Sequence, residues 1–226
     1  MKCIATLRND FHSKFGLPRQ SLLAPELLST IVFEPPYRDS SALRGIEQFS
    51  HLWLLWDFSE VPHDSDFQPT VRPPRLGGNR RVGVFASRSP FRPNPIGLTC
   101  VRLLDVELSA SDGPILHVAG ADMMDGTPIY DIKPYIPIAD CHPEATSGYT
   151  EATSSQAALD VDFLPGTTSD FTPEQVATLR QVLSQDPRPH YHTDSERVYT
   201  FSFAHHEVSF VVPTAGMLQV VKVMKK

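Results

Sequence analysis

The sequence predicts a mainly β protein, with a β-barrel or β-sandwich in residues 1–142 and a small α+β unit after it. Apolar runs in the first part are short, rich in β-branched and aromatic residues, and separated by Gly, Pro, Asp and Ser. This spacing is typical of strands and turns. A parallel α/β fold would need helices between its strands, and the only helical pattern there is segment 41–49, which Gly45 weakens.

Six segments carry the strand pattern in chain order: 3–7, 30–34, 51–58, 82–86, 96–104 and 115–120. The third segment, HLWLLWDF, is too continuous in apolar residues for a strand that faces water on one side. We therefore expect it to be central in the β domain, with a contact to a second subunit as the alternative.

A change of composition marks the end of the first domain. Segment 143–170 is rich in Ser, Thr and Ala and contains no Lys or Arg, which is typical of a linker. The sequence thus predicts a first domain at 1–142, a linker at 143–170 and a second domain at 171–226.

The second domain begins with a helix signal. Thr172 suits the N-cap, Pro173 the first helical position and Gln175 the closing position of a capping box. Three strand patterns follow the helix: 198–203, 207–212 and 217–223.

Charge is distributed unevenly along the chain. The 226 residues have a formal net charge of -6, a total that argues against a nucleic-acid partner. However, segment 67–104 contains no Asp or Glu and carries seven arginines: Arg72, Arg75, Arg80, Arg81, Arg88, Arg92 and Arg102. An acidic protein therefore contains one strongly positive segment.

Cysteine and histidine patterns exclude some classes of site. Cys3, Cys100 and Cys141 are widely spaced without a C-x-x-C motif, so neither a disulfide framework nor a zinc ribbon is expected. The histidines lack metal-ligand spacing, and we expect no metal. The first residues lack the apolar region of a signal peptide, and no run of about eighteen apolar residues occurs. We expect a soluble, cytoplasmic protein without a membrane contact.

Segment 88–98, RSPFRPNPIGL, combines two arginines with three prolines. Each proline fixes its own φ and restricts the preceding residue, so Arg88 and Arg92 sit on a stiff backbone. Guanidinium groups held in this way suit a carboxylate or a phosphate, unless they pair with the excess acids of the chain. Segment 71–81, VRPPRLGGNRR, has the composition of an exposed basic loop that either contacts phosphate or is merely solvated.

Acidic residues gather around a turn signal at Asp125 and Gly126, within ADMMDGTPIYDIKPYIP. Carboxylates on such a turn could hold a ribose or an amino group, and a plain hairpin turn with solvated charges is the alternative. The signatures G-x-S-x-G, the P-loop and G-x-G-x-x-G are absent. Pattern alone therefore indicates a β-rich domain with a preorganised basic site.

Four stretches together resemble the TsaA-like family, the tRNA methyltransferase O group: GVFASRSPFRPNPIGL, VRPPRLGGN, FSHLWLLWDF and DGTPIYDIKPYIP. The resemblance covers roughly the first 140 residues, and SQDPRPHYH followed by VYTFSF resembles the C-terminal extension of bacterial members. It implies a dimeric, single-sheeted β-barrel that uses S-adenosylmethionine. The implied reaction methylates N6 of threonylcarbamoyl-adenosine, immediately 3′ of the anticodon in threonine tRNA.

Carried onto this chain, the resemblance implies a cofactor site at Pro18, Arg19, Gln20, Ser59, Glu60, Arg88, Leu98, Asp125, Gly126, Thr127 and Pro128. Some members of the family have His-Gln where Ser59 and Glu60 stand. Arg88 would face the methionyl carboxylate or the adenosyl portion, on a backbone that keeps the cofactor placed for in-line transfer. A base could assist the carbamoyl-bearing acceptor nitrogen, and three residues are candidates by type: Asp122, Asp125 and Tyr135.

The resemblance also implies contacts to tRNA, which we expect from Arg72, Arg75, Arg80, Arg81, Arg92 and Arg188. Lys222, Lys225 and Lys226 would extend them. One alternative is a non-catalytic RNA-binding barrel that binds S-adenosylmethionine without transferring its methyl group. Another is a methyltransferase for a small molecule, which the overall acidity favours.

Overall fold

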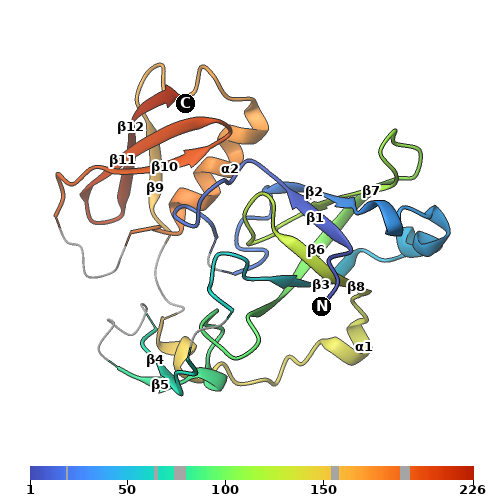
Figure 1. Ribbon diagram of the computed structural model, residues 1–226. Helices are drawn as coiled ribbons and strands as arrows, with labels where there is room; N and C mark the ends of the chain where they lie inside the picture. The colour runs from blue at the N-terminus through green and yellow to red at the C-terminus, as the bar shows by residue number, and fades with distance from the viewer. Residues whose placement is uncertain (19, 64–65, 74–79, 154–157, 189–193) are drawn as a thin grey trace.

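The computed structural model describes residues 1–18, 20–63, 66–73, 80–153, 158–188 and 194–226 of the chain. Two β units dominate it, a closed barrel and a four-stranded sheet on which one helix packs (Figure 1). The mainly β fold class predicted from the sequence is confirmed.

The barrel has six antiparallel strands in the order β1-β2-β7-β6-β3-β8, and β8 closes it by pairing with β1. Its strands are β1 (Ala5–Arg8), β2 (Leu28–Phe33), β3 (His51–Asp57), β6 (Ile96–Glu107), β7 (Ile115–Ala119) and β8 (Pro128–Pro134). Closure makes this a single-sheeted barrel rather than a sandwich. As expected for HLWLLWDF, β3 is central and pairs with β6 and β8.

Side chains of β3 alternate between the two faces of the barrel wall. Leu52, Leu54 and Trp56 are buried inside, whereas Trp53 remains partly exposed outside. The interior is close-packed, because a Cβ atom on Gly97 of β6 would lie 2.1 Å from the Trp56 indole. A glycine is therefore required where this ring lies against β6.

Only part of segment 82–86 forms a strand. β5 (Val82–Gly83) pairs with β4 (Thr70–Val71) in a two-stranded hairpin outside the barrel, and the 3-10 turn η5 (Val84–Ala86) follows. The hairpin belongs to the long connection between β3 and β6.

Segment 41–49 does not form a continuous helix. It contains the 3-10 turns η2 (Ser40–Leu43) and η3 (Ile46–Gln48), because Gly45 between them has a φ of 89°. The other short helical turns in the described residues are η1 (Pro35–Tyr37), α1 (Pro137–Asp140) and η6 (Gly148–Thr153).

The second sheet has the strand order β10-β11-β12-β9. Its unit consists of β9 (Asp160–Phe163), α2 (Pro173–Ser184), β10 (Tyr199–Phe203), β11 (His206–Thr214) and β12 (Met217–Lys225). The predicted capping box is confirmed, since the Thr172 and Gln175 side chains each accept a hydrogen bond from the other residue's backbone N–H. β9 lies inside segment 143–170, where we expected a linker, and pairs in parallel with β12. The domain boundaries stay a prediction.

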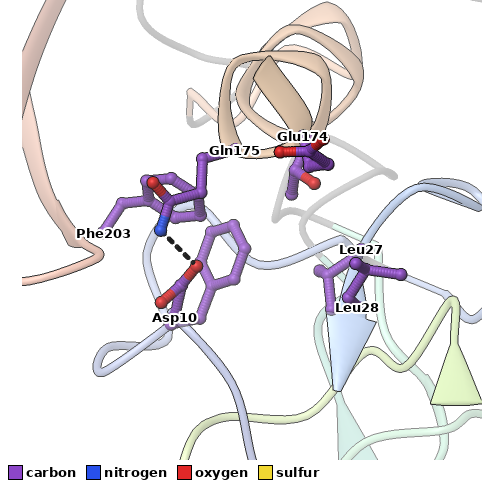
Figure 2. A pocket seen from close by; sticks show the side chains of 8 residues that line it. Asp10, Leu27, Leu28, Glu174, Gln175 and Phe203 are labelled. Carbon is purple, nitrogen blue, oxygen red and sulfur yellow. Dashed lines mark hydrogen bonds between the residues drawn. The ribbon is translucent and has the colours of Figure 1, made fainter. Parts of the chain in front are cut away.

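The two units contact each other through segment 9–27, which connects β1 to β2. Phe11 forms an isolated β-bridge with Phe203, and their ring centroids are 5.0 Å apart. Gln175, in the first turn of α2, donates from Nε2 to Oδ2 of Asp10 at 2.9 Å (Figure 2). The cavity between these contacts has a volume of only about 40 Å³, too small for a cofactor.

Long connections leave the barrel at one end. There β1, β3 and β7 finish and segments 9–27, 58–95 and 120–127 begin; we call this the long-loop end. The opposite end carries segment 34–50, segment 108–114 and the chain after β8. Because the strands are antiparallel, residues that follow β8 lie at the opposite end of the barrel from residues that follow β7.

Candidate active site and nucleic-acid interface

The proline-rich loop at the long-loop end is held by its own hydrogen bonds. The Ser87 hydroxyl donates to the Val84 carbonyl at 2.8 Å and accepts from the Ser89 N–H at 3.3 Å. Arg92 Nη1 donates to the Ser87 carbonyl at 3.2 Å. These bonds add to the restriction from the prolines and reduce the conformational freedom that the loop would lose when a ligand binds.

Arg88 projects from this loop as an exposed side chain. Its Nη1 donates to Oε1 of Gln20 at 2.6 Å, which brings together two residues of the predicted cofactor site. None of the ion pairs found in the described ranges involves Arg72, Arg81, Arg88 or Arg92. These guanidinium groups therefore keep donors that can meet an anionic ligand.

Asp122 lies near Arg88 at the end of a buried hydrogen-bond chain. Trp56 Nε1 donates to Thr99 Oγ1 at 2.9 Å, and Thr99 Oγ1 donates to Asp122 Oδ1 at 2.7 Å. Burial raises the pKa of the Asp122 carboxyl, and four contributions oppose the rise: the Thr99 hydroxyl, the backbone N–H of Asp122 itself, the Arg88 charge and the Ser21 backbone N–H. Asp122 is thus a fixed carboxylate beside a cation.

Asp125, by contrast, is already engaged by residues around it. Its carboxylate accepts the Asn9 N–H at 3.1 Å and lies 3.6 Å from both Arg8 Nη1 and His12 Nδ1. The predicted turn is present, with Gly126 at a φ of 82° and its N–H bonded to the Leu7 carbonyl at 2.9 Å. These contacts fasten the turn to the end of β1.

A wide groove of about 2260 Å³ lies at the long-loop end. Its lining includes the β4–β5 hairpin, the start of η6 and residues 187–188. Five arginines line it: Arg72, Arg81, Arg88, Arg92 and Arg188. Asp66 is the one acidic residue among the described residues that line it. The groove therefore suits a polyanion.

Arg188 differs from the other four because Asp186 neutralises it. Its Nε and Nη2 donate to the two carboxylate oxygens of Asp186 at 2.8 and 2.9 Å. Of the other residues predicted to contact RNA, Arg80 is exposed but does not line the groove. Arg75 lies outside the described residues.

The remaining predicted cofactor residues are spread around the long-loop end. Pro18 is buried, while Ser59 and Glu60 are exposed after β3. Glu60 lies 3.7 Å from Lys14 Nζ in segment 9–27. Arg19 lies outside the described residues.

Three further residues of that prediction lie on β6 and around the start of β8. Leu98, on the outer face of β6, is 56% exposed. Thr127 is buried and its hydroxyl donates to the Met124 carbonyl at 2.8 Å. Pro128 is the first residue of β8.

Tyr135 is not brought to this site. It follows β8 at the opposite end of the barrel, where its N–H donates to the His51 carbonyl at 3.0 Å. Its ring lies beside Trp53, with centroids 5.7 Å apart. Of the three candidate bases, Asp122 and Asp125 share the long-loop end and Tyr135 does not.

Sequence reasoning missed two groups at the long-loop end. Thr99 could have been found, because it is a polar residue at an inward position of β6 and is only 1% exposed. His63 lines the groove with Nε2 3.2 Å from Oδ1 of Asp57. Burial, together with the Asp57 carboxylate, raises the pKa of Tyr130. No sequence signal links those three residues.

Metal-ligand clusters and membrane-spanning helices are both absent from the described residues. In the part of the chain that the structure describes, no three His, Cys, Asp or Glu residues cluster as metal ligands would. Among those same residues, no helix is long and apolar enough to cross a membrane.

Comparisons with known proteins agree along nearly the whole chain. Residues 6–141 match the tRNA-methyltransferase O N-terminal domain, and residues 156–226 match the TrmO C-terminal domain. The chain is 40% identical over 222 residues to tRNA (adenine(37)-N6)-methyltransferase of Escherichia coli, covering 94% of this chain and 93% of that protein.

Two proteins of Pseudomonas aeruginosa are also similar to this chain. The putative S-adenosylmethionine-dependent methyltransferase RcsF is 40% identical over 193 residues, covering 83% of this chain and 81% of that protein. A crystal structure of TrmO superposes with a TM-score of 0.78 at 32% identity, covering 99% of this chain and 95% of that one. The chain therefore belongs to the tRNA-methyltransferase O family, the group that its sequence motifs resemble.

Proposed function

We propose that this chain transfers a methyl group from S-adenosylmethionine to N6 of adenosine 37 in tRNA. We further propose that the adenosine carries a threonylcarbamoyl group and lies immediately 3′ of the anticodon in threonine tRNA. The relative in Escherichia coli is named for the coarser reaction. The observation that carries the proposal is the arginine-lined groove, which reaches Arg88 and Gln20 beside Asp122.

The residues at the long-loop end fit S-adenosylmethionine in their chemistry. Arg88 offers guanidinium donors for a carboxylate, with Gln20 fixing its side chain. The carboxylate of Asp122 suits an ammonium or a sulfonium, and Leu98 offers exposed apolar surface for an adenine ring. When bound, the cofactor supplies a methyl group that the acceptor nitrogen displaces directly from sulfur.

The acceptor nitrogen must lose its proton, and the structure favours Asp122 as the group that receives it. Asp125 is occupied by Asn9, Arg8 and His12. Tyr135 stands at the opposite end of the barrel. Burial raises the pKa of Asp122, which makes its carboxylate a better proton acceptor.

The unpaired arginines of the groove would contact the phosphates of the anticodon arm. A threonylcarbamoyl group brings a carboxylate of its own, which a guanidinium can bind in bidentate fashion. The second unit would extend this surface, and we propose a homodimer, with which the partly exposed Trp53 on the outer face of β3 is compatible.

The test is mass spectrometry of nucleosides from threonine tRNA that carries the threonylcarbamoyl group, after incubation with the protein and labelled S-adenosylmethionine. A labelled methyl group on that adenosine is the expected result. Label on adenosine 37 of tRNA lacking the group would support only the coarser reaction. Binding of both ligands without any label would favour a non-catalytic binding protein instead.

A further inference from the structure

Two exposed phenylalanines stand in the arginine groove. Phe67 is 54% exposed and Phe85 is 71% exposed. Their rings are stacked, with centroids 6.0 Å apart and an interplanar angle of 24°. We propose that Phe67 and Phe85 form a stacking platform for an unpaired base of the bound RNA. This inference rests on the proposed function, which it deepens by naming a contact to the anticodon loop.

The local backbone fixes Phe85 in its exposed position. Its neighbour Val84 is 1% exposed, and the Val84 N–H donates to the Pro69 carbonyl at 3.0 Å. Arg81 Nη1 donates across the β4–β5 hairpin to Thr70 Oγ1 at 3.2 Å. Because Val84 is anchored inward at the start of η5, the next side chain points outward on a supported turn. A ring presented in this way loses little entropy when a base stacks on it.

The chemistry around the platform favours a nucleic acid over a protein. Both rings line the groove that Arg72 and Arg81 also line, and no ion pair found in the described ranges neutralises those arginines. Single-stranded RNA combines bases that stack on aromatic rings with phosphates that pair with arginine. A second copy docked across a two-fold axis at this groove would bring arginines against arginines, which is unfavourable.

The platform would select the structure of the RNA rather than its sequence. Every base has a π face, so stacking tolerates any sequence, but only a loop or an end offers a base that is free to stack. The platform would therefore favour the anticodon loop over the paired stem. It would help to position the loop so that adenosine 37 reaches the cofactor site.

The test is binding of the full-length protein to an RNA hairpin with the anticodon-arm sequence and to a blunt duplex of matched length. Phe85→Ala and Phe67→Ala are each expected to weaken hairpin binding about tenfold, equivalent to about 1.4 kcal/mol. Duplex affinity and S-adenosylmethionine affinity should not change. Phe85→Tyr should retain hairpin binding, whereas Phe85→Leu should not. Phe49→Ala removes a partly exposed ring from the opposite end and serves as the matched control.

An abasic hairpin series would identify the stacked base. At that position the losses from the abasic site and from Phe85→Ala should not add, because each removes the same contact. Three outcomes would overturn the proposal: equal loss of duplex binding, full recovery by Phe85→Leu, or a change of oligomeric state in either alanine variant by sedimentation. Since binding alone is measured, a wild-type protein that binds the hairpin without methylating tRNA would contradict the proposed function but not the platform.

Discussion

The two ends of the barrel use their polar side chains differently. At the opposite end, Trp53 Nε1 and the Ile136 N–H both donate to Oδ2 of Asp140, at 3.0 and 2.8 Å. Those groups satisfy one another's hydrogen-bonding capacity. At the long-loop end, Arg88 contacts only the neutral amide of Gln20 among the hydrogen bonds and ion pairs found in the described ranges, although a carboxylate lies nearby. The difference indicates that the Asp140 carboxylate is satisfied within the chain, whereas Arg88 keeps donors for a ligand.

The largest expected effect comes from removing the charge that we propose binds the cofactor. Arg88→Ala should lower kcat/KM for methyl transfer by roughly 10- to 100-fold, since a charged hydrogen bond contributes about 1.5–3 kcal/mol. Tyr135→Phe, at the opposite end, should leave kcat/KM within about twofold. Steady-state kinetics with labelled S-adenosylmethionine and modified tRNA measures both. An equal loss of kcat/KM in the two variants would contradict a functional difference between the two ends of the barrel.

Arg188→Ala serves as a control within the groove. Its guanidinium is already neutralised by Asp186, so its removal should weaken tRNA binding less than Arg72→Ala does and change its salt dependence less. If Arg188→Ala had the larger effect, the paired arginine and not the unpaired one would be the main phosphate contact.

Local features of the fold could be predicted from the sequence. Most strand positions followed from short runs of β-branched and aromatic residues, and the turn at Asp125 and the capping box at Thr172 depend on residues within four positions of each other. β9 was missed because the Ser- and Thr-rich composition around it suggests a linker. This four-residue strand exists because it pairs with β12, a contact that local composition does not report.

The arrangement of the candidate site could not be predicted in the same way. Thr99 meets Asp122, and Tyr135 lies away from both, because barrel closure and strand register decide which distant residues become neighbours. Spacing alone also left open whether the arginines pair with acids. The structure separates Arg88, which has no ion pair in the described ranges, from Arg188, which has one.

A smaller effect, on stability, sharpens the comparison of the two ends. Thr99→Val leaves Trp56 Nε1 and Asp122 Oδ1 without their shared partner in the barrel interior. The expected loss is about 1–3 kcal/mol in the free energy of unfolding, measured by urea denaturation. Thr6→Val is the matched control, since the Thr6 hydroxyl donates to Glu34 Oε1 at 2.9 Å beside the opposite end. If Thr6→Val lowered the free energy of unfolding more than Thr99→Val, the buried hydrogen bonds of Thr99 would not be the more stabilising ones.

The smallest expected effect concerns two carboxylates, Asp122 and Asp39, whose pKa values are shifted in opposite directions. Burial raises the pKa of Asp122, so its ionised form opposes folding, and its contribution to stability is greatest in acid and is lost as the pH rises through the folded pKa. The Ser41 side chain and N–H lower the pKa of Asp39 near the opposite end. Asp39 therefore contributes stability near neutral pH that is lost as the pH falls through its folded pKa.

Replacing each aspartate by Asn tests whether the two carboxylates affect the pH dependence of stability in opposite ways. Asp122→Asn keeps an oxygen that can accept the Thr99 hydroxyl, so it should raise the free energy of unfolding near pH 7, and the gain should shrink toward pH 4. Asp39→Asn should lower it near pH 7 and have no effect in strong acid. Urea denaturation across this pH range measures both variants. If Asp122→Asn were destabilising at every pH, the ionised carboxylate would be stabilised by its neighbours beyond the cost of its burial, and Asp122 would be a poor proton acceptor.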